Sequence, residues 1–383
     1  MCLNMDYQLE KMLEEGWTER FAQKFLRQIN SEKSSPNYKP EKVEWAHQHG
    51  FFASHASYYE HVRSVPENYL SDYVYYKTWP HNPWTRIWVN DKLTLKYLLA
   101  STEFGKLMPD YYYYTMQSGI RSLIDCPYHG FKFEEFVELL REKKHFACKP
   151  CNGSRSMGFV KMSYMDDVFY LNGKVVSCDD IQDFIFSHPN YIYTQYIVPA
   201  EYLRCYGEKI HTIRLIVLNE KGDNPQIIGG YVRFPTDNNG EANYSILDTN
   251  DIVNYNFFVG IDVQTGKFGK AKKVFENHIE DTDVHPETGA VVKGGVENYA
   301  SLTEMVLGIA RRFNVLQWFG VDIGATDEGF KCMEINTFPG VAYPQIFTPL
   351  LENKDCRQFF MNKMAEIDAM NTKKYFVRKD IKR

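Results

Sequence analysis

The chain has 383 residues, of which 44% are hydrophobic and 24% charged, and its formal net charge is −5. This balance is typical of a folded protein and excludes disorder over the whole length. The acidic net charge gives no footprint for nucleic acid, and the lack of an apolar run of about 20 residues argues against membrane insertion.

The start of the chain and its cysteines predict the compartment. Residues 1–6 contain no basic segment followed by an apolar run, so we expect no secretory signal. The eight cysteines form no obvious disulfide framework and are typical of reduced core residues. We therefore expect a cytoplasmic protein, with a homo-oligomer as one possible assembly.

The first 89 residues predict a helical, aromatic-rich N-terminal lobe. Apolar residues follow helical spacing over 7–30, and 31–40 is polar and broken by prolines. Residues 44–88 hold further aromatic segments.

Residues 90–198 predict a central lobe. A helix begins at Asn90-Asp91-Lys92, a second covers 133–144, and three short apolar runs over 145–176 then indicate strands. The four tyrosines of 111–114 predict a partly buried strand, with a sugar-lining surface as the alternative.

Residues 199–383 predict a C-terminal lobe rich in strands. An amphipathic helix over 299–313 presents one apolar face. Apolar runs indicate strands over 210–218, 227–234 and 257–263, after one at 191–198 that ends the central lobe. The whole is an α+β protein with much antiparallel sheet.

The most informative segment is 317–336, which predicts two strands around a tight turn. If residues 327–329 form a three-residue loop, Asp322 lies opposite Glu334, and Asn336 lies on the same face. Opposed carboxylates repel each other at a Cβ separation of about 5 Å, so a cation is expected between them. Two carboxylates and an amide oxygen suit Mg²⁺. The alternative is a surface hairpin whose charges meet nearby lysines or arginines.

The other face of this hairpin predicts a core. Its alternating residues are apolar and are expected to point away from the carboxylates: Val321, Ile323, Met333 and Ile335.

Residues 149–158 indicate a phosphate-binding loop between two strands. Backbone N–H groups of such small-residue loops can surround a phosphate, with Lys149 as a point charge and Arg155 as a fork. The order of residues differs from a Walker loop, and an ordinary turn between strands is the alternative.

Two arginines interrupt apolar strands. Arg214 and Arg233 need anions if they are buried, and two roles remain open. They either pair with the hairpin carboxylates or stabilise a transferring phosphoryl group or oxyanion.

The order of these motifs resembles the ATP-grasp superfamily. Residues 334–340, Glu-Ile-Asn-Thr-Phe-Pro-Gly, are similar to the metal-binding signature of D-alanine:D-alanine ligase-like enzymes. The segment from His285-Pro-Glu-Thr-Gly to residues 322–326 looks more like the sugar-transfer-associated ATP-grasp group, found with polysaccharide biosynthesis. The resemblance covers roughly Asn90 to Pro349 and implies a nucleotide held between two antiparallel-sheet lobes.

The resemblance also implies a ligand set of ATP with Mg²⁺, two ions being expected. The metal ligands it implies are Asp322, Glu334 and Asn336. The nucleotide-binding residues it implies are Lys92 and Lys149 at the phosphates, a covering loop of Ser154, Arg155, Ser156 and Met157, the adenine-reading segment Gln195, Tyr196 and Ile197, and Glu201 at the ribose. Arg214 would face the γ-phosphate and the acyl group.

The sequence departs from this pattern at two positions. Many family ligases carry an arginine where this chain has Gly320, and a glutamate where it has Gln195. Arg233 is the substitute expected for the missing oxyanion donor, so the expected catalytic set is Arg214, Arg233 and Lys149.

The function implied is an ATP-dependent carboxylate–amine ligase that forms an acyl phosphate. It would join an amino acid or sugar acid to a glycan or its precursor, so the partner is a small-molecule or glycan-linked substrate. The alternatives are a kinase of a sugar or polyol hydroxyl and a non-catalytic nucleotide-binding protein.

Overall fold

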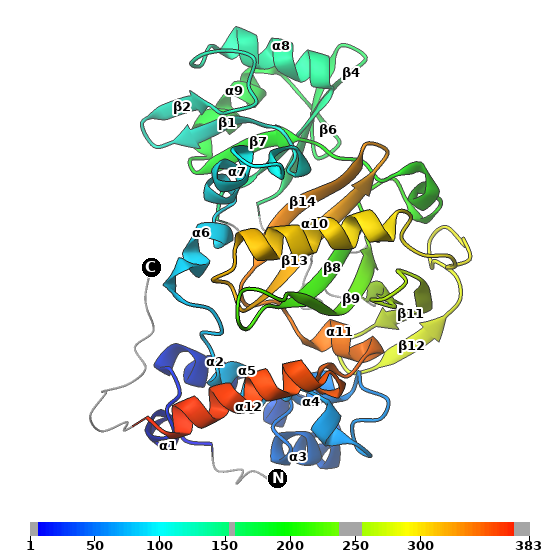
Figure 1. The fold of residues 1–383 in the computed structure, drawn as a ribbon. Coiled ribbons are helices and arrows are strands. Elements are labelled where there is room, and N and C mark those ends of the chain that lie inside the picture. The colour runs from blue at the N-terminus through cyan, green and yellow to red at the C-terminus, as the bar shows by residue number, and fades with distance from the viewer. Residues whose placement is uncertain (1–6, 153–157, 237–254, 371–383) are drawn as a thin grey trace.

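A computed structural model describes residues 7–152, 158–236 and 255–370. Figure 1 shows three tiers: one sheet with helices packed beside it, a second sheet crossed by a long helix, and a group of helices that contains both ends of the described chain. Residues 1–6, 153–157, 237–254 and 371–383 lie outside the described part. Within the described part, none of the helices has the length and apolarity that a membrane crossing requires.

The helical elements are mostly short. They are α1 (Leu9–Glu14), α2 (Glu19–Ser34), α3 (Pro40–Gln48), α4 (Ala53–Ala56), η1 (Pro66–Asn68), α5 (Asp72–Lys77), η2 (Trp84–Arg86), α6 (Ile87–Asn90), α7 (Lys92–Ala100), η3 (Gly105–Leu107), α8 (Phe133–Lys143), α9 (Cys178–Ser187), η4 (Glu201–Tyr206), α10 (Tyr299–Arg312), α11 (Ala342–Phe347), η6 (Leu350–Glu352) and α12 (Lys354–Asp368).

The N-terminal tier packs around aromatic side chains. Phe21, Phe25 and Ile29 lie along one face of α2 and are buried, as helical spacing requires. The last described helix, α12, joins this tier, because its Phe359 and Phe360 pack with residues of α5 and of the second sheet.

The first sheet has the strand order β2-β1-β7-β3-β4-β5-β6. Its strands are β1 (Tyr111–Met116), β2 (Gly119–Ser122), β3 (His145–Pro150), β4 (Val160–Met165), β5 (Val168–Leu171), β6 (Lys174–Val176) and β7 (Tyr191–Gln195). The tyrosines at 111, 112 and 113 are at most 2% exposed. The strand prediction is therefore confirmed, and their complete burial leaves no sugar-lining surface at these three positions.

The second sheet has the strand order β12-β11-β10-β9-β8-β13-β14. Its strands are β8 (Thr212–Leu218), β9 (Gln226–Phe234), β10 (Asn256–Ile261), β11 (Phe268–Val274), β12 (Ile279–Thr282), β13 (Trp318–Thr326) and β14 (Gly329–Asn336). Within each of the two sheets, all pairings between described strands are antiparallel.

The main core lies between the second sheet and α10, which crosses it in Figure 1. The predicted apolar face of this helix is confirmed, since Leu302, Val306 and Ile309 are fully buried there. We call the side of the sheet that packs on α10 the core face. The opposite side is the polar face.

Candidate functional site

The hairpin of β13 and β14 places its two carboxylates directly opposite each other. Asp322 pairs with Glu334, and Asn336 pairs with Gly320 one step further along the same face of β14. This register was predicted, but the predicted turn was wrong. Thr326 pairs with Gly329, so the loop has two residues instead of three.

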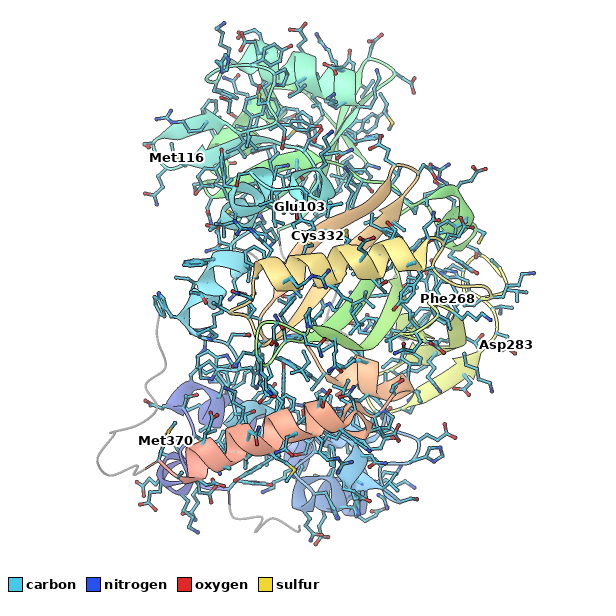
Figure 2. The ribbon with its side chains drawn as sticks, in the orientation of Figure 1. Glu103, Met116, Phe268, Asp283, Cys332 and Met370 are labelled. Carbon is cyan, nitrogen blue, oxygen red and sulfur yellow. The ribbon has the colours of Figure 1, made fainter. Side chains whose placement is uncertain are left out.

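A bulge restores the predicted register. One strand slips by a residue between Asp322 and Ile323, because Cys332 pairs with Ile323 and Met333 is left as the extra residue. Cys332, labelled in Figure 2, is consequently the fully buried core residue, whereas Met333 is only half-buried. The predicted core position of Met333 is corrected to Cys332, while Val321, Ile323 and Ile335 occupy the core as predicted.

Arg214 supplies the cation that the opposed carboxylates require. It lies opposite Asp322 on the neighbouring strand β8, and its Nε and Nη2 donate to the two oxygens of that carboxylate. Burial raises the pKa of Asp322, and the guanidinium opposes that shift. Of the two roles left open for Arg214, the structure therefore contains the pairing with a hairpin carboxylate.

Arg214, Asp322 and Glu334 form a row across three neighbouring strands, β8, β13 and β14. Lys92 provides the second cation of this charged row. Its Nζ lies 3.4 Å from Glu334 Oε2. Burial works against ionisation of Glu334, but Lys92 and then Arg214 hold the pKa of its carboxyl below the ordinary value. Lys92 begins α7, and its backbone N–H donates to Cys151 O at 3.3 Å, which ties this helix to the end of β3.

Lys149 lies on β3, two residues before Cys151. Among the described residues its ammonium forms no hydrogen bond or ion pair, and Glu334 acts on it only as a nearby charge. Burial, reinforced by Lys92, lowers the pKa of Lys149 to about 8. A desolvated ammonium beside a second ammonium favours an anionic ligand.

Arg233 extends the row along the polar face. It is 6% exposed, lies two residues from Tyr231, the partner of Arg214, and donates from Nη2 to Asn256 Oδ1 at 2.8 Å. In the described residues, four basic side chains thus meet two carboxylates. They are Lys92, Lys149, Arg214 and Arg233, against Asp322 and Glu334. This excess of positive charge matches a polyphosphate.

The donor set of the hairpin fits a hard cation. Two carboxylates and the Asn336 amide, whose Nδ2 lies 3.4 Å from Asp322 Oδ2, meet at one point. Rotation of that amide about χ2 would present its oxygen to the same point, and oxygen ligands suit Mg²⁺. Across the described ranges no cluster of three or more His, Cys, Asp and Glu side chains offers an alternative metal site.

Gly320 departs from the family pattern for a reason visible in the packing. A Cβ at this position would lie 2.8 Å from Pro339 Cβ and 3.1 Å from Arg214 Cδ. The proline loop after β14 thus occupies the space that a side chain at Gly320 would need.

The predicted covering loop lies outside the described residues, so Ser154, Arg155, Ser156 and Met157 are not placed. Both of its flanks contact the start of β7. Asn190 Nδ2 donates to Asn152 Oδ1 at 2.9 Å, and Tyr191 Oη donates to Gly158 O at 2.8 Å.

The predicted adenine segment connects the two sheets. Gln195 ends β7 and exchanges hydrogen bonds with the backbone of Asp110. The ring of Tyr196 lies under Lys161 Nζ at 4.2 Å. Ile197 Cδ1 would be 3.0 Å from a Cβ on Gly324, which follows Asp322 by two residues on the same strand. Ile197 therefore packs on the polar face close to Asp322.

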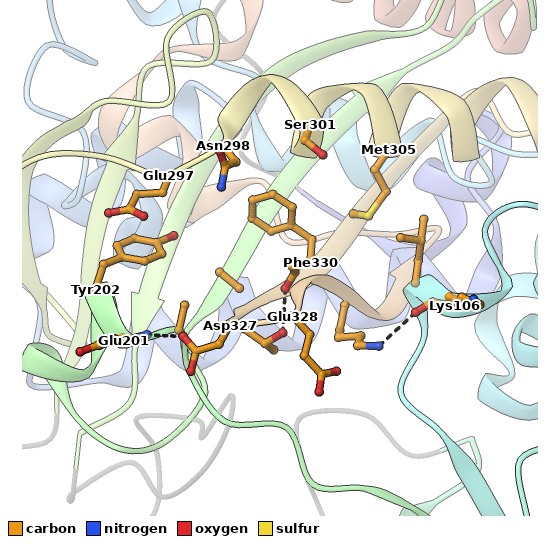
Figure 3. Close-up of a pocket in the computed structure, with 16 residues that line it drawn as sticks. Lys106, Glu201, Tyr202, Glu297, Asn298, Ser301, Met305, Asp327, Glu328 and Phe330 are labelled. Carbon is orange, nitrogen blue, oxygen red and sulfur yellow. Dashed lines mark hydrogen bonds between the residues drawn. The ribbon is translucent and has the colours of Figure 1, made fainter.

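Glu201 lies apart from the charged row. It is exposed and lines a pocket of about 1120 Å³ at the tip of the hairpin, shown in Figure 3. The pocket lies beside α10, with Met305 and Phe330 on its walls, and neither Asp322 nor Lys149 lines it.

Two contacts from the N-terminal segment were missed at the sequence level. The Asn82 amide and the Tyr75 hydroxyl bond to the backbone at the open end of the hairpin. No local signal reveals them, because an Asn before a proline indicates only a turn and the bonded residues are more than 230 positions apart.

Comparison with known proteins identifies a family for this arrangement. Residues 80–354, more than half of the chain, match the family described as sugar-transfer associated ATP-grasp. Comparison with curated proteins gives no match.

Solved structures resemble the chain distantly. D-alanyl-alanine synthetase A from Vibrio cholerae O1 biovar eltor shares 14% identity, with a TM-score of 0.39, over 72% of this chain and 66% of that one. D-alanine–D-alanine ligase from Bacillus anthracis shares 13%, with a TM-score of 0.36, over 93% of each chain. L-amino acid ligase from Bacillus licheniformis shares 9%, with a TM-score of 0.34, over 67% of this chain and 42% of that one. The chain thus spans less than two thirds of the length of two of these three.

Proposed function

Because the chain belongs to the sugar-transfer-associated ATP-grasp family, we propose that it is an ATP- and Mg²⁺-dependent carboxylate–amine ligase. ATP-grasp enzymes generally use ATP and Mg²⁺. The observation that carries the proposal is the row Arg214, Asp322 and Glu334 across three adjacent strands, with Lys92 against its end. Such a row holds a polyphosphate and a hard cation together.

In the proposed reaction, a substrate carboxylate oxygen attacks the γ-phosphorus of ATP and the bond to ADP breaks. An amine then attacks the acyl phosphate, phosphate leaves, and the amine gives up a proton to form the amide. The protein contributes mainly charge and position, as in phosphoryl transfer generally.

Each side chain of the row has a role in this scheme. Asp322, Glu334 and Asn336 would hold Mg²⁺, which supplies neutralisation of phosphate charge when bound. Lys149 and Lys92 would bind phosphate oxygens, since Lys149 is desolvated and has no ion-pair partner among the described residues.

The two arginines would act on the acyl side. Arg214 pairs with Asp322, and when that carboxylate is used to hold Mg²⁺, the guanidinium would be available to the γ-phosphate or acyl oxygen. Arg233, buried on the same face, would be the second oxyanion donor.

The nucleotide base and the loop complete the proposal. Gln195, Tyr196 and Ile197 would read adenine, and Glu201 would hold the ribose. Ser154, Arg155, Ser156 and Met157 would cover the phosphates. The substrates would be an amino acid or sugar acid and a glycan or its precursor, in polysaccharide biosynthesis in the cytoplasm.

The test is product analysis with the whole chain. The protein is incubated with ATP, Mg²⁺ and paired panels of carboxylates and amines, and products are read by mass spectrometry. A ligase releases ADP and phosphate with an amide only when both acceptors are present. A phosphorylated alcohol without free phosphate would overturn ligation in favour of a kinase, and nucleotide binding without ADP release would indicate a non-catalytic protein.

A pair of lysine variants controls the assay. Lys149→Met should abolish the ligase products, whereas Lys174→Met, exposed on the edge strand β6 of the first sheet, should leave them unchanged. Equal activity of both variants would remove Lys149 from the site.

A further inference from the structure

The open end of the metal-site hairpin is held by the N-terminal segment. The pairing of β13 with β14 ends at Gly320 and Asn336, so Asn336 is the last residue of its ladder. Terminal residues of a strand are the first to open unless other contacts hold them. Asn336 is also the least anchored of the three proposed metal ligands, because Asp322 and Glu334 are paired inside the ladder.

The side chain of Asn82 bridges the two strands where the ladder stops. Its Nδ2 donates to Trp318 O at 2.6 Å and to Thr337 O at 3.0 Å. Its Oδ1 accepts from the N–H groups of Gln317 at 2.8 Å and Trp318 at 3.0 Å. Asn82 is 3% exposed and thereby uses the full hydrogen-bonding capacity of an amide. The Asn82 side chain thus supplies hydrogen bonds between the two strands one residue beyond the last backbone pair of the ladder.

Thr337, the residue that follows β14, makes a second hydrogen bond, to the segment that leads into Lys92. Thr337 Oγ1 donates to Asn90 Oδ1 at 2.9 Å. Asn90 ends α6 two residues before Lys92, whose ammonium lies beside Glu334. The segment 82–92 therefore contacts both strands of the hairpin and delivers Lys92 to it.

A third bond comes from the N-terminal lobe proper. Tyr75 Oη donates to Pro339 O at 2.5 Å, and its ring stacks on Phe338 at 4.5 Å between centroids. The backbone from 337 to 339 is consequently bonded at Thr337 and Pro339 by residues that precede Lys92.

We propose that Asn82 and Asn90 are positioning residues that fix Asn336 and Lys92 for binding of a divalent cation with the nucleotide, which rests on the proposed function. Neither residue contacts the cation site itself. Both act one residue away from Asn336, through hydrogen bonds to Thr337, and not on a metal ligand directly.

The test measures binding rather than turnover. Mn²⁺ is titrated into the full-length protein at saturating ADP and followed by electron paramagnetic resonance, and ADP affinity without metal is measured by calorimetry. Asn82→Ala and Asn90→Ala should weaken Mn²⁺ binding by up to about tenfold, the lower end of the effect of losing a direct partner of a metal ligand. ADP affinity without metal should fall less than Mn²⁺ affinity, because Lys149, the other proposed phosphate ligand, is not held by these two asparagines.

Matched variants separate positioning from stability. Asn219 is as buried as Asn82, at 1% exposure, but its Nδ2 donates to Ala310 O of α10. Asn219→Ala should lower the melting temperature and leave Mn²⁺ affinity unchanged. Thr337→Val should behave like Asn90→Ala, and Thr337→Ser, which keeps the hydroxyl, like the wild type.

The outcomes are distinguishable from failure of the proposed function. Absence of Mn²⁺ and ADP binding by the wild type would overturn the proposed function and this inference together. Wild-type Mn²⁺ affinity in Asn90→Ala, or equal weakening in Asn219→Ala, would overturn this inference alone. Asn90 is exposed, so its variant is expected to fold even if Asn82→Ala does not.

Discussion

Around the hairpin, the two faces of the second sheet are built from the same strands and have opposite chemistry, although nearer the N-terminal tier the polar face also carries apolar residues such as Trp318. On the core face, Val321, Ile323 and Ile335 are at most 2% exposed and pack with α10. One residue along the chain, on the polar face, Asp322 and Glu334 meet Arg214 and Lys92. At these positions the alternation of a strand thus places apolar packing on one face and the charged side chains on the other.

The pKa values of titratable groups also shift for different reasons on the two faces. His211 and His285 lie against Phe234 on the core side, and burial lowers the pKa of each imidazole to about 4, which keeps it neutral. On the polar face, the neighbouring cations keep Glu334 ionised despite burial. Substitutions on the core face should therefore change stability, and those on the polar face should change ligand binding.

The largest effect is expected from Glu334→Gln. The change preserves shape but removes one of two opposed carboxylates, so ATP turnover should fall by a factor on the order of 1,000. ADP release measures the loss, and thermal unfolding checks that the fold is retained. Glu41→Gln, at an exposed position of α3, is the control and should not change turnover. Unchanged turnover in Glu334→Gln would remove this residue from the metal site.

On the core face, Ile323→Ala is the counterpart. It removes a fully buried side chain directly beside Asp322 and should cost about 3 kcal/mol of unfolding free energy. Urea unfolding measures the loss. Nucleotide affinity per folded molecule should match the wild type, and a loss of affinity in the folded variant would show that the two faces are not independent.

The pH dependence of stability tests the neutral histidines. In the unfolded chain they take up a proton near the ordinary histidine pKa of 6.5, but burial lowers the pKa in the folded chain to about 4. Stability from this source is therefore complete above pH 6.5 and is lost as the pH falls toward 4, by up to about 3 kcal/mol for each histidine. Urea midpoints between pH 7 and 4.5 follow the loss.

A histidine variant isolates this contribution. His285→Phe should flatten the acid limb of the stability curve, because the ring already lies among Phe234, Phe257 and Tyr206. His61→Gln, exposed in the N-terminal tier, should leave the curve unchanged. An acid limb as steep in His285→Phe as in the wild type would contradict the assignment.

Much of the fold could be predicted because alternation and helical spacing are local. The face of α10 and the strand around Tyr112 follow directly from those periods. The pairing of Asp322 with Glu334 was also predicted, although from a turn one residue too long. The bulge at Met333 compensated for that error, and nothing in the local pattern indicates where a bulge lies.

The rest depends on contacts between distant parts of the chain. The anion of Arg214 could not be chosen from sequence, because the choice depends on β8 lying beside β13, more than 100 residues later. The contact of Asn82 with Trp318 spans 236 positions. Such contacts depend on the tertiary arrangement of distant segments, and the local sequence pattern of a segment does not indicate which other segment it will contact.

The smallest effect concerns a glycine that the polar face requires. In Gly320→Ala, the new Cβ would approach Pro339 at 2.8 Å and Arg214 at 3.1 Å, so one of them must shift. Overpacking of this kind costs roughly 1–2 kcal/mol. Because a displaced Arg214 would alter its pairing with Asp322, the variant should also change Mn²⁺ binding with ADP, unlike a core substitution of equal cost. Gly340→Ala, in the same loop but with open space around its Cβ, is the control. If Gly320→Ala lowered stability but left Mn²⁺ binding unchanged, position 320 would behave like a core position. The contact of Gly320 with Pro339 would then contribute to packing and not to the charged site.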